Sequence, residues 1–116
     1  MTNSFSVHGL KTPILKEGDD LVGVLQESLK NTDAGTFADN DILVIAEAPL
    51  ATTEGRIVKI SETSPSEKAE ELACKYHIDP RLAEIVLEES DEVVGGVLGY
   101  LLARRENMFL PNAGID

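Results

Sequence analysis

Residues 64–89 read SPSEKAEELACKYHIDPRLAEIVLEE, and two helix-start signals in this stretch set the order of the elements around it. The first signal combines Ser64 as an N-cap, Pro65 in the first helical turn and Glu67 as the second half of a capping box. This combination predicts a helix that ends near Tyr76.

A second helix start follows at Asp79-Pro80, where a capping side chain again precedes a proline. Only the short link His77–Asp79 separates the two helices, so we expect a helical pair. Apolar residues recur at three-to-four spacing on each helix and give each one an inward face. The inward positions are Ala69, Leu72, Ala73 and Tyr76 on the first helix, and Leu82, Ile85, Val86 and Glu89 on the second.

Strands are expected directly after the helical pair. The segment Val93–Leu110 contains Tyr100–Arg104 and Met108–Leu110, joined by a plausible hairpin turn at Arg105-Glu106-Asn107. The glycines of Gly95–Gly99 do not have the spacing of a dinucleotide-binding fingerprint, and no helix pattern follows them. Tight packing or a β-bulge explains them better.

The first part of the chain predicts a strand, a loop and a helix. Ser4–His8 alternates small polar residues with apolar ones, which is typical of a short strand. After a loop, Asp19 or Asp20 can cap a helix that runs to about Lys30 with an apolar stripe.

Two further strands are predicted between this helix and the helical pair. Asp41–Ala46 is continuously apolar after its first residue, the pattern of a strand buried on both faces, and Arg56–Ile60 is a possible partner. The predicted order of elements is β-loop-α-β-β-α-α-β-β. It indicates an α+β, or mixed α/β, domain with a mixed sheet, antiparallel hairpins and about three helices.

Composition excludes some classes of function. The net charge of -11 repels nucleic-acid backbones, and the ten basic residues are scattered. Val93–Ala103 is apolar but too short to span a membrane. The single cysteine, Cys74, excludes an internal disulfide, which fits a cytoplasmic location. The acidity itself indicates either a solvated surface or carboxylates that hold divalent cations.

The loop His8–Asp20 is a candidate binding segment because a helix N-terminus, which favours anions, follows it. Asp19 and Asp20 would compete with a phosphate at that end, so recognition of a planar base against Pro13 and Leu15 is physically easier. An ordinary strand-to-helix loop is the alternative.

The segment Pro111–Asp116, PNAGID, is the most informative candidate site. Asn-Ala-Gly is a turn signal with a permissive glycine, Gly114. Ile115 can anchor this turn in a core and leave Asp116 facing outward, where its carboxylate suits a hard cation or a phosphate-bound Mg²⁺. A metal site needs several ligands, so we expect this chain to contain only part of one.

Three other charged positions are ambiguous. Glu47 and Glu54 flank the connection after the predicted strand, where ligands commonly bind in α/β folds, but Glu54-Gly55-Arg56 can equally be a simple turn with an exposed ion pair. Glu89 lies on an apolar helix face, so it must reach water at the helix end or a partner such as Arg56 or a metal.

Taken together, these segments resemble the N-terminal half of the coenzyme F(420)-0:gamma-glutamyl ligase family. The resemblance runs from about Val7 to Asp116, and the order and spacing of its pieces are more specific than any single piece. The pieces are GLKTPILK (9–16), GDDL (18–21), DILVIA (41–46), EGR (54–56), SPSE (64–67), DPRL (79–82) and NAGID (112–116).

The resemblance implies a GTP-dependent ligase that joins the amino group of L-glutamate to a carboxylate of a deazaflavin coenzyme precursor through an acyl phosphate. It also implies a divalent cation, Mg²⁺ or Mn²⁺, with a monovalent cation as a further candidate. The family fold implies an intertwined homodimer with sites near the subunit junction. No nucleic-acid or membrane partner is expected.

Site residues carry over by position. Asp116 would be a metal ligand, while Glu54 and Arg56 match a family motif near the active site without an assigned role. The nucleotide would be bordered, largely through backbone, by Leu10, Lys11, Thr12, Pro13, Ile14 and Leu15.

The chain departs from the family pattern at Ala48 and Thr52, where the family usually has lysines that neutralise phosphates. Residues 1–116 are therefore expected to be the N-terminal part of a ligase-type domain, inactive without the family's remaining chain. The alternatives are a stand-alone, non-catalytic nucleotide-binding or assembly module of the same fold, and a plain structural domain.

Overall fold

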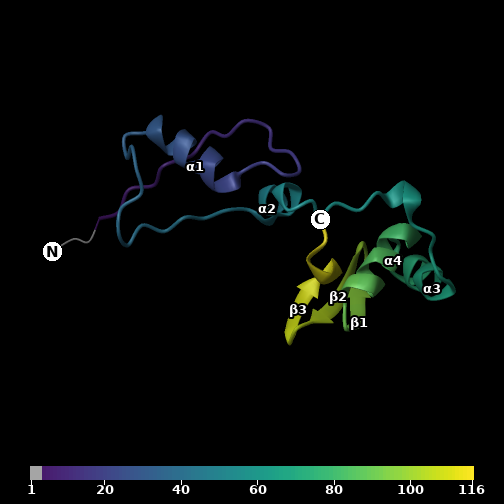
Figure 1. Cartoon of the computed structure of the whole chain (residues 1–116). Helices are drawn as coiled ribbons and strands as arrows, with labels where there is room; N and C mark the ends of the chain where they lie inside the picture. The colour runs from purple at the N-terminus through teal and green to yellow at the C-terminus, as the bar shows by residue number, and fades with distance from the viewer. Residues whose placement is uncertain (1–3) are drawn as a thin grey trace. The chain divides into compact units, whose positions relative to one another are not determined.

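The computed structural model describes residues 4–116, and this part of the chain divides after Ile57 into two compact units. The first unit contains helices α1 (Leu21–Lys30) and α2 (Glu47–Thr53). The second contains all the strands of the described chain (Figure 1). Its elements are η1 (Ile60–Glu62), α3 (Glu67–Tyr76), α4 (Pro80–Glu89), β1 (Glu92–Val97), β2 (Tyr100–Arg105), β3 (Met108–Pro111) and η2 (Asn112–Gly114).

The predicted helical pair is confirmed, although α3 begins two residues later than its cap signal indicated. Ser66, not Ser64, is the N-cap, and its Oγ accepts a hydrogen bond from the backbone N–H of Ala69 at 3.2 Å. The backbone N–H of Ser66 donates to Glu84 on α4 at 2.6 Å. This contact with α4 holds Ser66 as the N-cap and leaves Pro65 outside the helix.

Helix α4 begins as predicted, with Asp79 as N-cap and Pro80 in the first turn. The Asp79 carboxylate accepts from the backbone N–H of Arg81 at 2.8 Å and from its guanidinium at 2.6 Å. The side-chain hydrogen bond from Arg81 is the main cause that lowers the pKa of Asp79 to about 2.

The lowered pKa gives a pH dependence with a definite sign. Because 2 lies below the ordinary value of 3.8, ionised Asp79 stabilises the fold above about pH 4, and that contribution is lost as the pH falls through about 2. Arg81→Gln should raise the midpoint of Asp79 toward its ordinary value, as measured by carboxyl ¹³C NMR. An unchanged midpoint would contradict this ion pair.

The sheet is antiparallel throughout, in the order β1-β2-β3. The predicted hairpin is confirmed: Arg105 pairs with Met108, and the intervening Glu106 and Asn107 both have positive φ, as a tight two-residue hairpin turn requires. A bulge interrupts β1 between Val93 and Gly95, which confirms the interpretation of the glycine-rich stretch.

One face of the sheet carries the core of the second unit. Helix α4 lies against β1 and β2 (Figure 1), and side chains from both helices, β2 and the turn after β3 meet there. The opposite face remains exposed and forms a shallow apolar hollow of about 410 Å³ lined by Val97, Tyr100, Leu102 and their neighbours. The core consists of Ala69, Leu72, Ala83, Val86, Leu101, Ala103 and Ala113.

Gly96 is required by close packing. A Cβ at this position would lie 2.6 Å from the backbone oxygen of Tyr100 and 3.0 Å from the ring of Tyr76, whereas one at Gly95 would meet nothing within 4 Å. Tight packing at this glycine, expected from the sequence, is thereby confirmed.

The two neighbouring glycines provide a matched test. Gly96→Ala should lower the free energy of unfolding by about 1–3 kcal/mol because the backbone contact forces β1 and β2 apart. Gly95→Ala should change it far less. Urea denaturation of both variants measures the difference. Equal losses of unfolding free energy would show that the close contact at Gly96 does not determine the cost of the substitution.

The first unit corrects the predicted strands. Helix α1 is confirmed, with Asp20 accepting from Gly23 N–H at 3.1 Å. However, Ser4–His8, Asp41–Ala46 and Arg56–Ile60 contain no strand, and helix α2 occupies most of the expected connection. The strand predictions were wrong because a β-strand needs a hydrogen-bonded neighbour, and none pairs with these segments within residues 4–116.

Candidate functional site

The loop before α1 is held at its end by its own carboxylates. Asp19 accepts from the backbone N–H of Lys16 at 2.7 Å, and Asp20 caps the helix. The N–H of Gly18 donates to the carbonyl of Thr53 at 3.0 Å, which ties the loop to the end of α2. Because Asp20 occupies the N-terminus of α1, that helix end does not offer a free anion site.

The same loop carries basic side chains that have no internal partner. Lys11 and Lys16 are exposed, and neither forms an ion pair within the described part of the chain, residues 4–116. Lys30 of the same unit, by contrast, pairs with Glu27 at 2.7 Å. The two loop lysines are therefore available to an anionic ligand.

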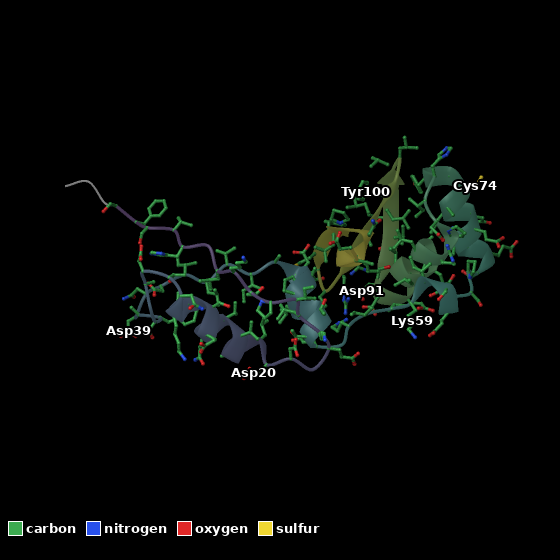
Figure 2. All side chains as sticks on the ribbon, turned by 90° about the horizontal axis from the view of Figure 1, so that it is seen from above. Asp20, Asp39, Lys59, Cys74, Asp91 and Tyr100 are labelled. Atoms are coloured by element: carbon green, nitrogen blue, oxygen red, sulfur yellow. The ribbon has the colours of Figure 1, made fainter. Side chains whose placement is uncertain are left out.

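The proposed nucleotide-bordering residues lie together on this loop. Leu10, Thr12 and Leu15 are half-buried, and they alternate with the exposed residues between them, without regular secondary structure. Pro13 and Ile14 are exposed, so an apolar surface is open to a planar ring. Figure 2 shows the side chains of this unit, with Asp20 labelled at the start of α1.

Glu54, Gly55 and Arg56 form a turn at the end of α2, not a strand end. The N–H of Arg56 donates to the carbonyl of Ala51 at 2.8 Å. Gly55 has φ +69°, and the carboxylate of Glu17 lies against it, 2.7 Å from where a Cβ would be. The turn interpretation of this motif is therefore confirmed, and it brings Glu54 and Arg56 near the loop before α1 within the first unit.

The C-terminal turn has the anatomy that its sequence predicts. Ile115 packs against the core of the second unit and Asp116 is exposed. Asn112, Ala113 and Gly114 all have positive φ, at 47°, 55° and 80°. Sequence reasoning missed that the side chain of Asn112 is itself buried, although asparagine in an Asn-Ala-Gly turn tolerates this backbone region.

The described residues can contribute to a metal site but do not complete one. Asp116 offers a hard carboxylate oxygen of the type that Mg²⁺ and Mn²⁺ bind. Residues 4–116 contain no group of three or more His, Cys, Asp or Glu side chains able to hold a metal ion. Asp116 thus offers one hard oxygen ligand, and the described residues bring no complete set of metal ligands together.

The charged side chains at the end of the sheet, including the candidate Glu89, form structural ion pairs. Glu89 pairs with Arg105 at 2.7 Å, a partner that the sequence did not suggest. Arg104 lies 3.6 Å from Asp91 and 3.5 Å from Glu92, so carboxylates and arginines neutralise each other at this end of the sheet. Cys74 is exposed on α3, as its label in Figure 2 marks.

Comparison with known proteins identifies the class to which this fold and loop arrangement belong. The family model described as F420-0:Gamma-glutamyl ligase matches residues 9–116. A protein named Coenzyme F420:L-glutamate ligase from Archaeoglobus fulgidus is 36% identical over 112 residues, which cover 97% of this chain and 42% of that protein. Proteins of the same name from Methanothermobacter thermautotrophicus and Natronomonas pharaonis are 33% and 34% identical, over 90% and 97% of this chain.

The chain therefore belongs to the F420-0:gamma-glutamyl ligase family, which confirms the resemblance found in the sequence. It spans about two fifths of the length of these relatives, at 42%, 41% and 44%. Among the helices of residues 4–116, none is both long enough and apolar enough to cross a bilayer.

Proposed function

We propose that this chain is the N-terminal part of a GTP- and divalent-cation-dependent ligase that forms a gamma-glutamyl-type amide bond on a deazaflavin coenzyme precursor. The family match over residues 9–116 carries this proposal. The names of the relatives support glutamate as the amine substrate.

In the proposed reaction, the γ-phosphoryl group of GTP activates a carboxylate for amide-bond formation. A carboxylate oxygen of the precursor attacks the γ-phosphorus of GTP, and GDP leaves. The glutamate nitrogen then attacks the carbonyl carbon of the acyl phosphate, phosphate leaves, and the nitrogen loses a proton. Positioning and charge stabilisation dominate such phosphoryl transfers, so the protein's part is to bind and orient charged reactants.

The first unit supports binding of the nucleotide. Lys11 and Lys16 are cations without an internal partner in the described residues, and an overall charge of -11 makes such local donors necessary for an anionic substrate. Pro13 and Ile14 present apolar surface to a guanine ring. Glu54 and Arg56 would border this site.

Asp116 would hold a divalent cation together with ligands beyond those described. When bound, Mg²⁺ or Mn²⁺ would neutralise part of the crowded negative charge of phosphates and carboxylates. A monovalent cation could serve the same electrostatic purpose. If water were excluded from the site, the lower dielectric constant would strengthen both electrostatic effects.

Helix α2 favours a second candidate function. Ala48 and Thr52 are four residues apart on this helix, so they share one face. Loss of both family lysines removes two positive charges from that face together. A non-catalytic nucleotide-binding or assembly module of the same fold is consistent with this change.

A thermal shift separates nucleotide binding, which the ligase requires, from a module that serves assembly alone. The ligase predicts that GTP with Mn²⁺ raises the Tm of the purified protein, while ATP with Mn²⁺ does not, because only a ligand that binds the folded state stabilises it. Lys11→Gln should weaken the GTP effect by removing an unpaired cation. Lys30→Gln, whose partner is Glu27, should leave it unchanged.

The outcomes of this experiment are distinct. No shift with either nucleotide would exclude nucleotide binding by the isolated chain and favour the assembly module. Equal sensitivity to Lys11→Gln and Lys30→Gln would place the nucleotide away from the loop.

A homodimer is the proposed assembly, and the segment 41–46 supports it. Ile42 and Val44 are 89% and 87% exposed, and the backbone of 42–45 makes no backbone hydrogen bond within residues 4–116. An apolar run with unpaired backbone groups is an unstable arrangement in water and a template for pairing with another chain.

Charge substitutions test this assembly. Val44→Asp should weaken self-association about tenfold or more, since about 1.4 kcal/mol corresponds to tenfold and a buried unpaired charge exceeds it. Val22→Asp is the matched control, because Val22 is an exposed valine on α1. Sedimentation velocity measures the dissociation constant, and equal values for the two variants would argue against pairing through 41–46.

A further inference from the structure

The turn after β3 has an unusual, left-handed backbone conformation. Three consecutive residues, Asn112, Ala113 and Gly114, lie in the left-handed region, with φ of 47°, 55° and 80°. Only glycine adopts this region freely, and an alanine there is strained. Such strain persists only where the surroundings hold it, and it concentrates at functional positions.

The surroundings that hold this turn are specific. Asn112 is only 7% exposed, and its Oδ1 accepts a hydrogen bond from the backbone N–H of Leu101 on β2 at 2.9 Å. The carbonyl of Asn112 accepts from the N–H of Ile115 at 3.0 Å. Ala113 is 4% exposed and belongs to the core. One buried side chain thus connects the middle strand of the sheet to the turn.

The direction of the chain after this turn follows from these contacts. Ile115 packs on the core, so the next residue, Asp116, has its backbone placed by anchored neighbours while its carboxylate stays exposed. A flexible turn would present the same carboxylate in many directions. An ordered one presents it in few, which reduces the entropy lost when a ligand binds.

We propose that Asn112 is a positioning residue: its buried amide oxygen fixes the left-handed turn and thereby orients the Asp116 carboxylate toward a divalent cation. This inference rests on the proposed function, in which Asp116 is a cation ligand. Asn112 does not touch the ion, and it acts through the Leu101 hydrogen bond and the backbone of the turn.

The test measures cation binding directly, without enzymatic activity. Mn²⁺ is titrated into the ¹⁵N-labelled protein, and paramagnetic broadening of the Ile115 amide is compared with that of Asp39, an exposed carboxylate residue in the first unit. In the wild type, Ile115 should broaden at lower Mn²⁺ than Asp39. Asp116→Asn should abolish this preference.

Two glycine variants isolate the role of the amide. Asn112→Gly still allows the left-handed backbone but removes the hydrogen-bond acceptor. It should raise the Mn²⁺ concentration needed for half-broadening of the Ile115 amide about tenfold, the lower end of the range for losing a group that orients a metal ligand. Ala113→Gly adds a glycine to the same turn but keeps the Asn112 bond, so it should have a much smaller effect.

Each result decides one of the two hypotheses. Preferential broadening that survives Asp116→Asn overturns the proposed metal role. Broadening lost in Asp116→Asn, but equally affected in Asn112→Gly and Ala113→Gly, overturns the positioning role alone. If Asn112→Gly does not fold, wild-type heteronuclear NOE values decide: values for 114–116 as high as those of β2 support positioning, and values typical of a frayed end overturn it.

Discussion

Close contact between helix α4 and strand β2 is the interaction on which the second unit depends. Ala83 and Val86 on the helix and Leu101 and Ala103 on the strand are at most 1% exposed. Because two of these four are alanines, the helix axis can approach the sheet closely, and any larger side chain would separate the layers. The turn after β3 adds Ala113 to the same core, so the position of the Asp116 side chain is linked to this packing.

Local signals explain which elements the sequence could predict. The two capped helices and the hairpin at Glu106 and Asn107 are set by residues adjacent in the chain, and the structure contains them. The segments 41–46 and 56–60 have strand-like composition, but a strand forms only with a neighbour, and composition does not name one. Helix α2 was missed because its short sequence, EAPLATT, has no side-chain cap.

The candidate site was predictable to a similar extent. The exposed loop before α1 and the outward carboxylate of Asp116 follow from turn chemistry within a few residues. The burial of Asn112 does not, since its partner Leu101 is eleven residues earlier on another strand. The same holds for Glu89, whose partner Arg105 is sixteen residues away. Long-range hydrogen bonds and ion pairs are what a single sequence leaves undetermined.

The sheet of the second unit has two edge strands, β1 and β3, and a face on which Val97, Tyr100 and Leu102 are exposed. Neither edge strand carries a proline at its centre, and no lysine lies in β1 or β3 to discourage foreign strands. While the chain is still folding, such unpaired edges and exposed apolar side chains make it prone to pair with other chains.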